Sequence, residues 1–276
     1  MGILNCGMRG HDVSCGDIIS LSNQMGELGV RHIQFAPKKS FKDIKWNCGV
    51  MTPGFGEYIK SELDKNNVRV SVLGCYINPV HHDPEERQAQ LEWFKANLKF
   101  ARYIGADMVG TETGHVNHLG IEDKLRAYDI FEESMRELIY CAEKYGVTLG
   151  VEPVTKDNLN DVESTVRFVE EMNSPNLSVI FDPVNMIDGS NYQYQDEIIT
   201  GMFRELGDKI DILHLKDFTI EDGRKVPTLA CSGMLNTDLL FDIMRERKPF
   251  IDCILETTDE QTYADTLARV QAKWQS

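Results

Sequence analysis

Residues 131–154 read FEESMRELIYCAEKYGVTLGVEPV, and this stretch decides the fold. Apolar side chains recur at the spacing of one helical face, at Phe131, Met135, Leu138 and Ala142. Gly146 ends that pattern, as glycine commonly does after a helix. The mostly apolar run 147–154 follows at once and is typical of a strand covered on both faces. The stretch therefore predicts a helix that leads into a strand of a parallel sheet.

The same alternation of short apolar runs and helical stretches extends over the whole chain, as in βαβ units. The predicted strands are residues 3–8, 32–36, 68–76, 108–111, 147–154, 177–181, 210–215 and 253–257. An open doubly wound sheet is the alternative, but residues 6–11 lack the G-x-G-x-x-G motif of its first turn. Eight strands in 276 residues fit an α/β fold, the (β/α)₈ TIM barrel, which needs about 250 residues. We predict one such domain over residues 1–276, with long irregular loops at 37–56 and 219–234.

Composition and charge narrow the classes of partner and of cellular location. The net charge of −15 and the lack of a basic stripe argue against nucleic acid as a partner. No apolar run approaches the roughly 18 residues of a membrane span, and the N-terminus lacks the apolar core of a signal peptide. Seven widely spaced cysteines without a C-x-x-C motif are typical of reduced thiols. We expect a cytoplasmic protein without a membrane partner, and a homo-oligomer remains open.

The last four predicted strands end in side chains that can bind metal, namely Glu152, Asp182, His214 and Glu256. Each alone has an ordinary explanation: a salt bridge for Glu152, a turn for Asp182, a core position for His214, and a helix cap for Glu256. In a barrel, however, the C-terminal ends of the strands meet at the active-site end, which we call the mouth. Three negative charges that converge there require a cation or shifted pKa values. Three oxygens and one imidazole suit Mn²⁺, Mg²⁺, Co²⁺ or Zn²⁺.

These strand ends also resemble a known family. The runs Val-Glu-Pro, Phe-Asp-Pro-x-Asn, His-Leu-Lys-Asp and Leu-Glu-Thr are similar to those of the xylose isomerase-like TIM barrel superfamily, in particular its sugar phosphate isomerase/epimerase branch. The resemblance implies that Glu152, Asp182, His214 and Glu256 bind one catalytic divalent metal ion. It also implies that Glu152 and Glu256 form an acid/base pair.

The implied activity is the isomerisation or epimerisation of a small keto-sugar or related polyol. The metal polarises a carbonyl and stabilises an enediolate, while one carboxylate removes a proton and a second acid returns one. A lyase of the inosose-type or dehydroshikimate-type dehydratase class is the alternative, because an enolate expels a hydroxyl β to the carbonyl. A metal-dependent endonuclease would need more histidines at the strand ends, and a non-catalytic sugar-binding barrel would not need a complete ligand set.

Further residues near the predicted mouth are candidates for substrate contact: His81, Glu112, His115, Asn185, Lys216 and Asp217. Lys216 follows His214 by two positions, so both side chains point the same way along a strand. For Lys216 an ion pair with Asp217 or another carboxylate is the alternative, and for Glu112 a solvated loop position. Many relatives have histidine in place of Asn185, and Cys231-Ser232-Gly233 replaces a common Gly-x-Gly, so the substrate is expected to differ. His118 is a further loop histidine near the mouth.

Overall fold

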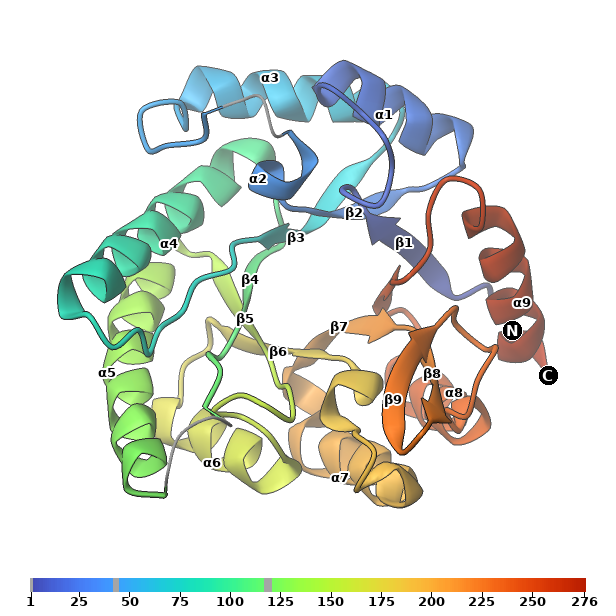
Figure 1. Cartoon of the computed structure of the whole chain (residues 1–276). Coiled ribbons are helices and arrows are strands. Elements are labelled where there is room, and N and C mark those ends of the chain that lie inside the picture. The colour runs from blue at the N-terminus through green and yellow to red at the C-terminus, as the bar shows by residue number, and fades with distance from the viewer. Residues whose placement is uncertain (1, 42–44, 117–120) are drawn as a thin grey trace.

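The computed structural model describes residues 2–41, 45–116 and 121–276, so the predicted loop residue His118 lies outside the described residues. Eight parallel strands close into a barrel in the order β1-β2-β3-β4-β5-β6-β7-β10, and helices surround it (Figure 1). The barrel strands are β1 Asn5–Arg9, β2 His32–Phe35, β3 Arg69–Gly74, β4 Met108–Glu112, β5 Thr148–Glu152, β6 Leu177–Phe181, β7 Ile210–Leu215 and β10 Asp252–Leu255. The predicted TIM barrel and its eight strands are confirmed.

β6 and β7 have the predicted bounds. The other strand ends differ from the prediction by at most two residues, as two examples show. The predicted strand 147–154 ends at Glu152, because Pro153 has no N–H to donate to a sheet. The predicted strand 253–257 ends at Leu255, and Thr257 has a left-handed backbone with φ of 56°.

Apart from the short α2, the α-helices form a ring outside the barrel and pack their apolar faces against it (Figure 1). Their bounds are α1 Ile18–Glu27, α2 Pro37–Ser40, α3 Pro53–Asp64, α4 Pro84–Ile104, α5 Ile121–Tyr145, α6 Val162–Met172, α7 Gln195–Leu206, α8 Thr237–Arg247 and α9 Tyr263–Gln275. Short 3₁₀ helices span Pro183–Met186, Tyr192–Tyr194 and Gly207–Lys209. The α5 residues expected on one face are all buried, namely Phe131, Met135, Leu138 and Ala142. No helix within the described ranges has the length and apolar character of a transmembrane span.

The two predicted irregular loops contain regular structure that the sequence analysis missed. The loop 37–56 holds α2, and α3 already begins at Pro53. The loop 219–234 holds most of an antiparallel hairpin, β8 Asp217–Glu221 and β9 Arg224–Thr228. Its turn residues Asp222 and Gly223 both have positive φ, 48° and 73°, which is the geometry of a two-residue hairpin turn. Asp-Gly is a strong sequence signal for such a turn, so the hairpin was predictable.

The interior of the barrel is filled by a small apolar cluster, Val72, Met108, Ile180, Ile212 and Ile254. Two glycines make room for it. A Cβ on Gly110 would lie 2.7 Å from Ile180 Cδ1, and one on Gly150 would lie 2.7 Å from Met108 Sδ. Because this cluster closes the barrel, any site that uses the strand ends lies above it, at the mouth.

Candidate metal and substrate site

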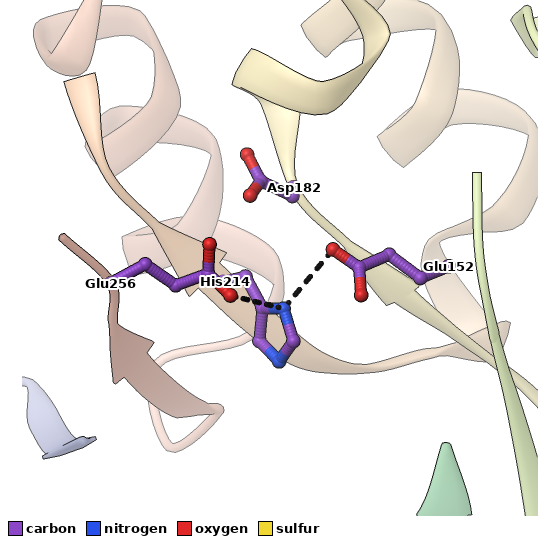
Figure 2. A group of neighbouring side chains, drawn as sticks. All are labelled: Glu152, Asp182, His214 and Glu256. Carbon is purple, nitrogen blue, oxygen red and sulfur yellow. Dashed lines mark hydrogen bonds and ion pairs between the residues drawn. The ribbon is translucent and has the colours of Figure 1, made fainter. Parts of the chain in front are cut away.

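The structure brings the four predicted ligands together at the mouth. Glu152 is the last residue of β5, His214 lies in β7, and Asp182 and Glu256 directly follow β6 and β10. One potential ligand atom from each lies within 4.8 Å of the others, and all four residues are buried. In Figure 2, Glu152 and Glu256 lie on either side of His214, with Asp182 nearby. We call these four residues the central cluster.

His214 joins the two glutamates. Its Nδ1 lies 3.2 Å from Glu152 Oε1 and 3.3 Å from Glu256 Oε1 (Figure 2). Its Nε2 is buried and has no hydrogen-bond partner among the described residues. Burial alone would lower the pKa of His214, but the neighbouring carboxylates outweigh burial and raise it. The imidazole therefore supplies positive charge to the cluster when it is protonated.

Asp182 combines a structural and an electrostatic role. Its Oδ1 accepts the backbone N–H groups of Val184 (2.9 Å) and Asn185 (3.2 Å), which caps the short helix Pro183–Met186. Its Oδ2 accepts a hydrogen bond from Lys216 Nζ at 2.5 Å. Burial raises the pKa of the Asp182 carboxyl, and Lys216 opposes that rise. Asp182 therefore does stabilise a turn, which was the alternative considered from the sequence. Its second oxygen, Oδ2, still faces the site.

Lys216 lies between two acids of the central cluster. Its Nζ is 2.5 Å from Asp182 Oδ2 and 2.7 Å from Glu256 Oε2, so its partners are these carboxylates and not Asp217. Burial alone would lower the pKa of Lys216, but the two carboxylates outweigh burial and raise it. A buried ammonium in this position compensates charge that would otherwise be uncompensated.

Arg9 is a residue that the sequence analysis did not single out. It ends β1, and its NH1 lies 3.4 Å from Glu256 Oε1. Burial alone would raise the pKa of Glu256, but the cations around it, led by Lys216, hold that pKa well below its usual range. The position of Arg9 at the C-terminal end of a strand was the available signal.

The other predicted contacts fall into different surroundings. Asn185 Nδ2 donates to Glu152 Oε1 at 2.7 Å, so this side chain belongs to the site. The Asp217 carboxylate accepts hydrogen bonds from three backbone N–H groups: that of Phe218 in β8 (2.7 Å), and those of Gly233 and Leu235 in the loop after β9 (both 2.8 Å). Asp217 thus stabilises the loop after β9, a function that the sequence did not indicate.

A second group of side chains lies beside Glu152. Glu112 is aligned with Glu152 across β4 and β5, and burial followed by the charge of Glu152 raises the pKa of Glu112. Glu112 also approaches His115 and the buried Asp157, and Asp157 Oδ1 is 2.5 Å from His115 Nδ1. Asp157 was missed because it lies in a loop. His81 stands apart from this group: its Nδ1 accepts the backbone N–H of Asp83, next to the start of α4.

Comparison with known proteins gives a family and a set of similar folds. The sequence profile of the family described as "Xylose isomerase-like TIM barrel" matches residues 24–275. No curated protein sequence matches significantly. A D-tagatose 3-epimerase-like protein is similar in structure, with a TM-score of 0.77 at 16% identity, over 99% of this chain and 97% of that one.

Two further solved structures show the same fold. For 3-keto-D-glucoside 4-epimerase from E. coli the TM-score is 0.75 at 14% identity, over 98% of this chain and 99% of that one. For the IOLI protein with a bound zinc atom, the TM-score is 0.74 at 15% identity, over 98% of both chains. Because the family profile spans residues 24–275 and the barrel is closed, this chain belongs to the xylose isomerase-like TIM barrel family.

Proposed function

We propose that this protein is a divalent-metal-dependent isomerase or epimerase that acts on a small keto-sugar or a related polyol. The observation that carries the proposal is the central cluster, whose four potential ligand atoms lie within 4.8 Å of one another at the mouth of the barrel. Support also comes from the names of similar structures, which include two sugar epimerases or epimerase-like proteins. A barrel of this family with such a cluster is well suited to chemistry next to a carbonyl.

The residues of the central cluster fit a divalent cation. Three carboxylates and one imidazole are donors that Mn²⁺, Mg²⁺, Co²⁺ and Zn²⁺ accept. Lys216 pairs with two of the three acids and supplies positive charge to them. When bound, the metal would act as a Lewis acid toward a carbonyl and the hydroxyl beside it. That chemistry makes the proton on the intervening carbon easier to remove.

We assign the exchange of that proton to Glu152 and Glu256. They approach His214 from opposite sides, so a substrate between them would meet one carboxylate on each face (Figure 2). Glu152 Oε1 is already engaged by Asn185 and His214, whereas no hydrogen bond within the described ranges engages its Oε2. We assign proton removal to Glu152 Oε2. Glu256 is ionised because of its low pKa, so it receives a proton from the Lys216 ammonium, 2.7 Å from its Oε2, and passes it to the other face of the carbon, which inverts that carbon.

The test is solvent deuterium uptake at carbon. The protein, loaded with Mn²⁺ in D₂O, is given a panel of ketoses, inososes and dehydroshikimate, and products are followed by NMR. Glu152→Gln is expected to lower uptake by about 10²- to 10⁴-fold, the usual contribution of a positioned general base. Its fold should persist, as judged by circular dichroism. Glu221→Gln, an exposed position on the hairpin, is the matched control.

Two outcomes would change the assignment. Undiminished uptake in Glu152→Gln removes Glu152 as the base. A product with a new ultraviolet chromophore, formed from an inosose or from dehydroshikimate, indicates the dehydratase alternative, because dehydration creates a conjugated double bond and epimerisation does not.

A further inference from the structure

Basic side chains gather on the side of the mouth that the proposed reaction does not use. Arg9 ends β1, His11 follows it by two residues, and Lys39 lies in α2, which follows β2. His11 and Lys39 line one pocket, and burial first, then the charges of Arg9 and Lys39, lower the pKa of His11 to about 4. The whole chain carries a net charge of −15, so a group of cations here is a local feature and not a reflection of composition.

His11 and Lys39 border a pocket of about 320 Å³. Its polar lining comes from His11, Ser14, Lys39 and Ser40, and we call it the basic pocket. Two of its polar atoms, His11 Nδ1 and Ser40 Oγ, are buried without a hydrogen-bond partner among the described residues. Buried polar groups without partners are uncommon because each costs desolvation free energy, so these two call for a ligand that supplies partners.

Lys39 supplies the charge of the basic pocket. Its Nζ lies 3.7 Å from the centre of the Tyr76 ring, a contact in which the ring attracts the ammonium. Burial, followed by the repulsion from Arg9, lowers the pKa of Lys39. An anion placed beside both cations would relieve that repulsion. The charge of Glu256, a residue of the central cluster, acts on both His11 and Lys39, and so does the charge of Arg9, which contacts Glu256.

We propose that the basic pocket binds an anionic group, a phosphate or a carboxylate, at the end of the substrate that is remote from the reacting carbonyl. The Lys39 ammonium provides charge, while the Ser40 hydroxyl and the neutral His11 imidazole provide hydrogen-bond donors, a set that suits several oxygens on one anion. The assignment of this anion to the substrate rests on the proposed function. The binding of an anion in the basic pocket is independent of the proposed function.

The kinetic test compares substrates that differ only in charge. Deuterium uptake by the Mn²⁺-loaded protein is measured for ketohexoses, for the same ketohexoses with a terminal phosphate, and for keto-acids with a terminal carboxylate. We expect kcat/KM to be at least roughly tenfold higher for one of the anionic series, as one charge-assisted contact provides. The series that is preferred distinguishes phosphate from carboxylate.

A pair of adjacent lysines provides the matched variants. Lys39→Met should lower kcat/KM for the anionic substrate by roughly tenfold to a hundredfold and change the neutral sugar much less. Lys38→Met is the control, because Lys38 lies in the same helix but its Nζ stacks on Trp93, 3.7 Å from the ring centre, and does not line the basic pocket. Should Lys39→Met fail to fold, Ser40→Ala removes one donor with little change in volume.

A binding measurement separates this inference from the proposed function. Calorimetric titration of the metal-loaded protein with inorganic phosphate, and with acetate, should give binding that Lys39→Met weakens and Lys38→Met preserves. Such binding without deuterium uptake from any sugar would support the basic pocket and overturn the proposed function. Equal kcat/KM for charged and neutral sugars, with Lys39→Met indistinguishable from Lys38→Met in both measurements, would overturn the basic pocket alone.

Discussion

The two sides of the barrel mouth differ in charge and in the way the chain builds them. On one side the central cluster stands on residues within or directly after β5, β6, β7 and β10. On the other side Arg9 ends a strand, but His11 and Lys39 stand on the segments that follow β1 and β2. The acidic side is thus part of the barrel frame, whereas the basic side depends on the path of two loops. We infer that metal binding depends on residues of the barrel strands. The preference for a charged substrate depends on residues of the loops.

The largest expected effect on the free energy of unfolding comes from a substitution that removes positive charge from the acidic side. Lys216→Met leaves Asp182 and Glu256 without their shared ammonium. Removing one partner of a buried ionic network costs about 3–5 kcal/mol, so the free energy of unfolding in EDTA should fall by that amount. Saturating Mn²⁺ should recover much of the loss, because a divalent cation compensates the same carboxylates. Urea denaturation with and without Mn²⁺ measures both quantities.

Lys60→Met is the control for this experiment. The Lys60 ammonium pairs with Asp64 at 2.5 Å on the exposed face of α3, where an ion pair contributes at most about 1 kcal/mol. A loss in Lys216→Met that is the same in EDTA and in Mn²⁺ would show that Lys216 and the metal do not serve the same carboxylates. The acidic side would then not depend on a cation in the proposed way.

The comparison also explains what the sequence could predict. The central cluster was predictable because strand ends are recognisable from apolar runs and a closed barrel brings them to one mouth. Arg9 obeys the same rule and could have been found. Asp157 and Lys39 could not, because each lies in a segment between strands, where spacing does not determine which side chains meet. The hairpin is an intermediate case, since its Asp-Gly turn was visible but the contacts of Asp217 were not.

A smaller effect on the free energy of unfolding is expected for Asp217, which binds backbone N–H groups of the loop after β9. Asp217→Asn replaces a charged acceptor of three backbone N–H groups by an amide with one acceptor oxygen, so the free energy of unfolding should fall by about 2–3 kcal/mol. Asp211→Asn is the control, because Asp211 is an exposed aspartate on β7, the strand that precedes β8. Denaturation and deuterium uptake are measured together. Unchanged stability with reduced uptake would make Asp217 a substrate contact, as the sequence predicted.

The smallest expected effect concerns the basic side and appears as a pH dependence. Burial, followed by Arg9 and Lys39, lowers the pKa of His11 from 6.5 to about 4. Below pH 6.5 the unfolded chain therefore binds a proton at this position that the folded chain does not bind, so stability decreases as the pH falls from 6.5 toward 4. Part of the imidazole contacts water, so we discount the full shift and expect a contribution on the order of 1 kcal/mol. His11→Asn should remove that part of the loss, which urea denaturation at pH 7 and pH 4.5 measures for both proteins. An identical pH dependence in the two proteins would mean that burial and the neighbouring cations together do not lower the pKa of His11.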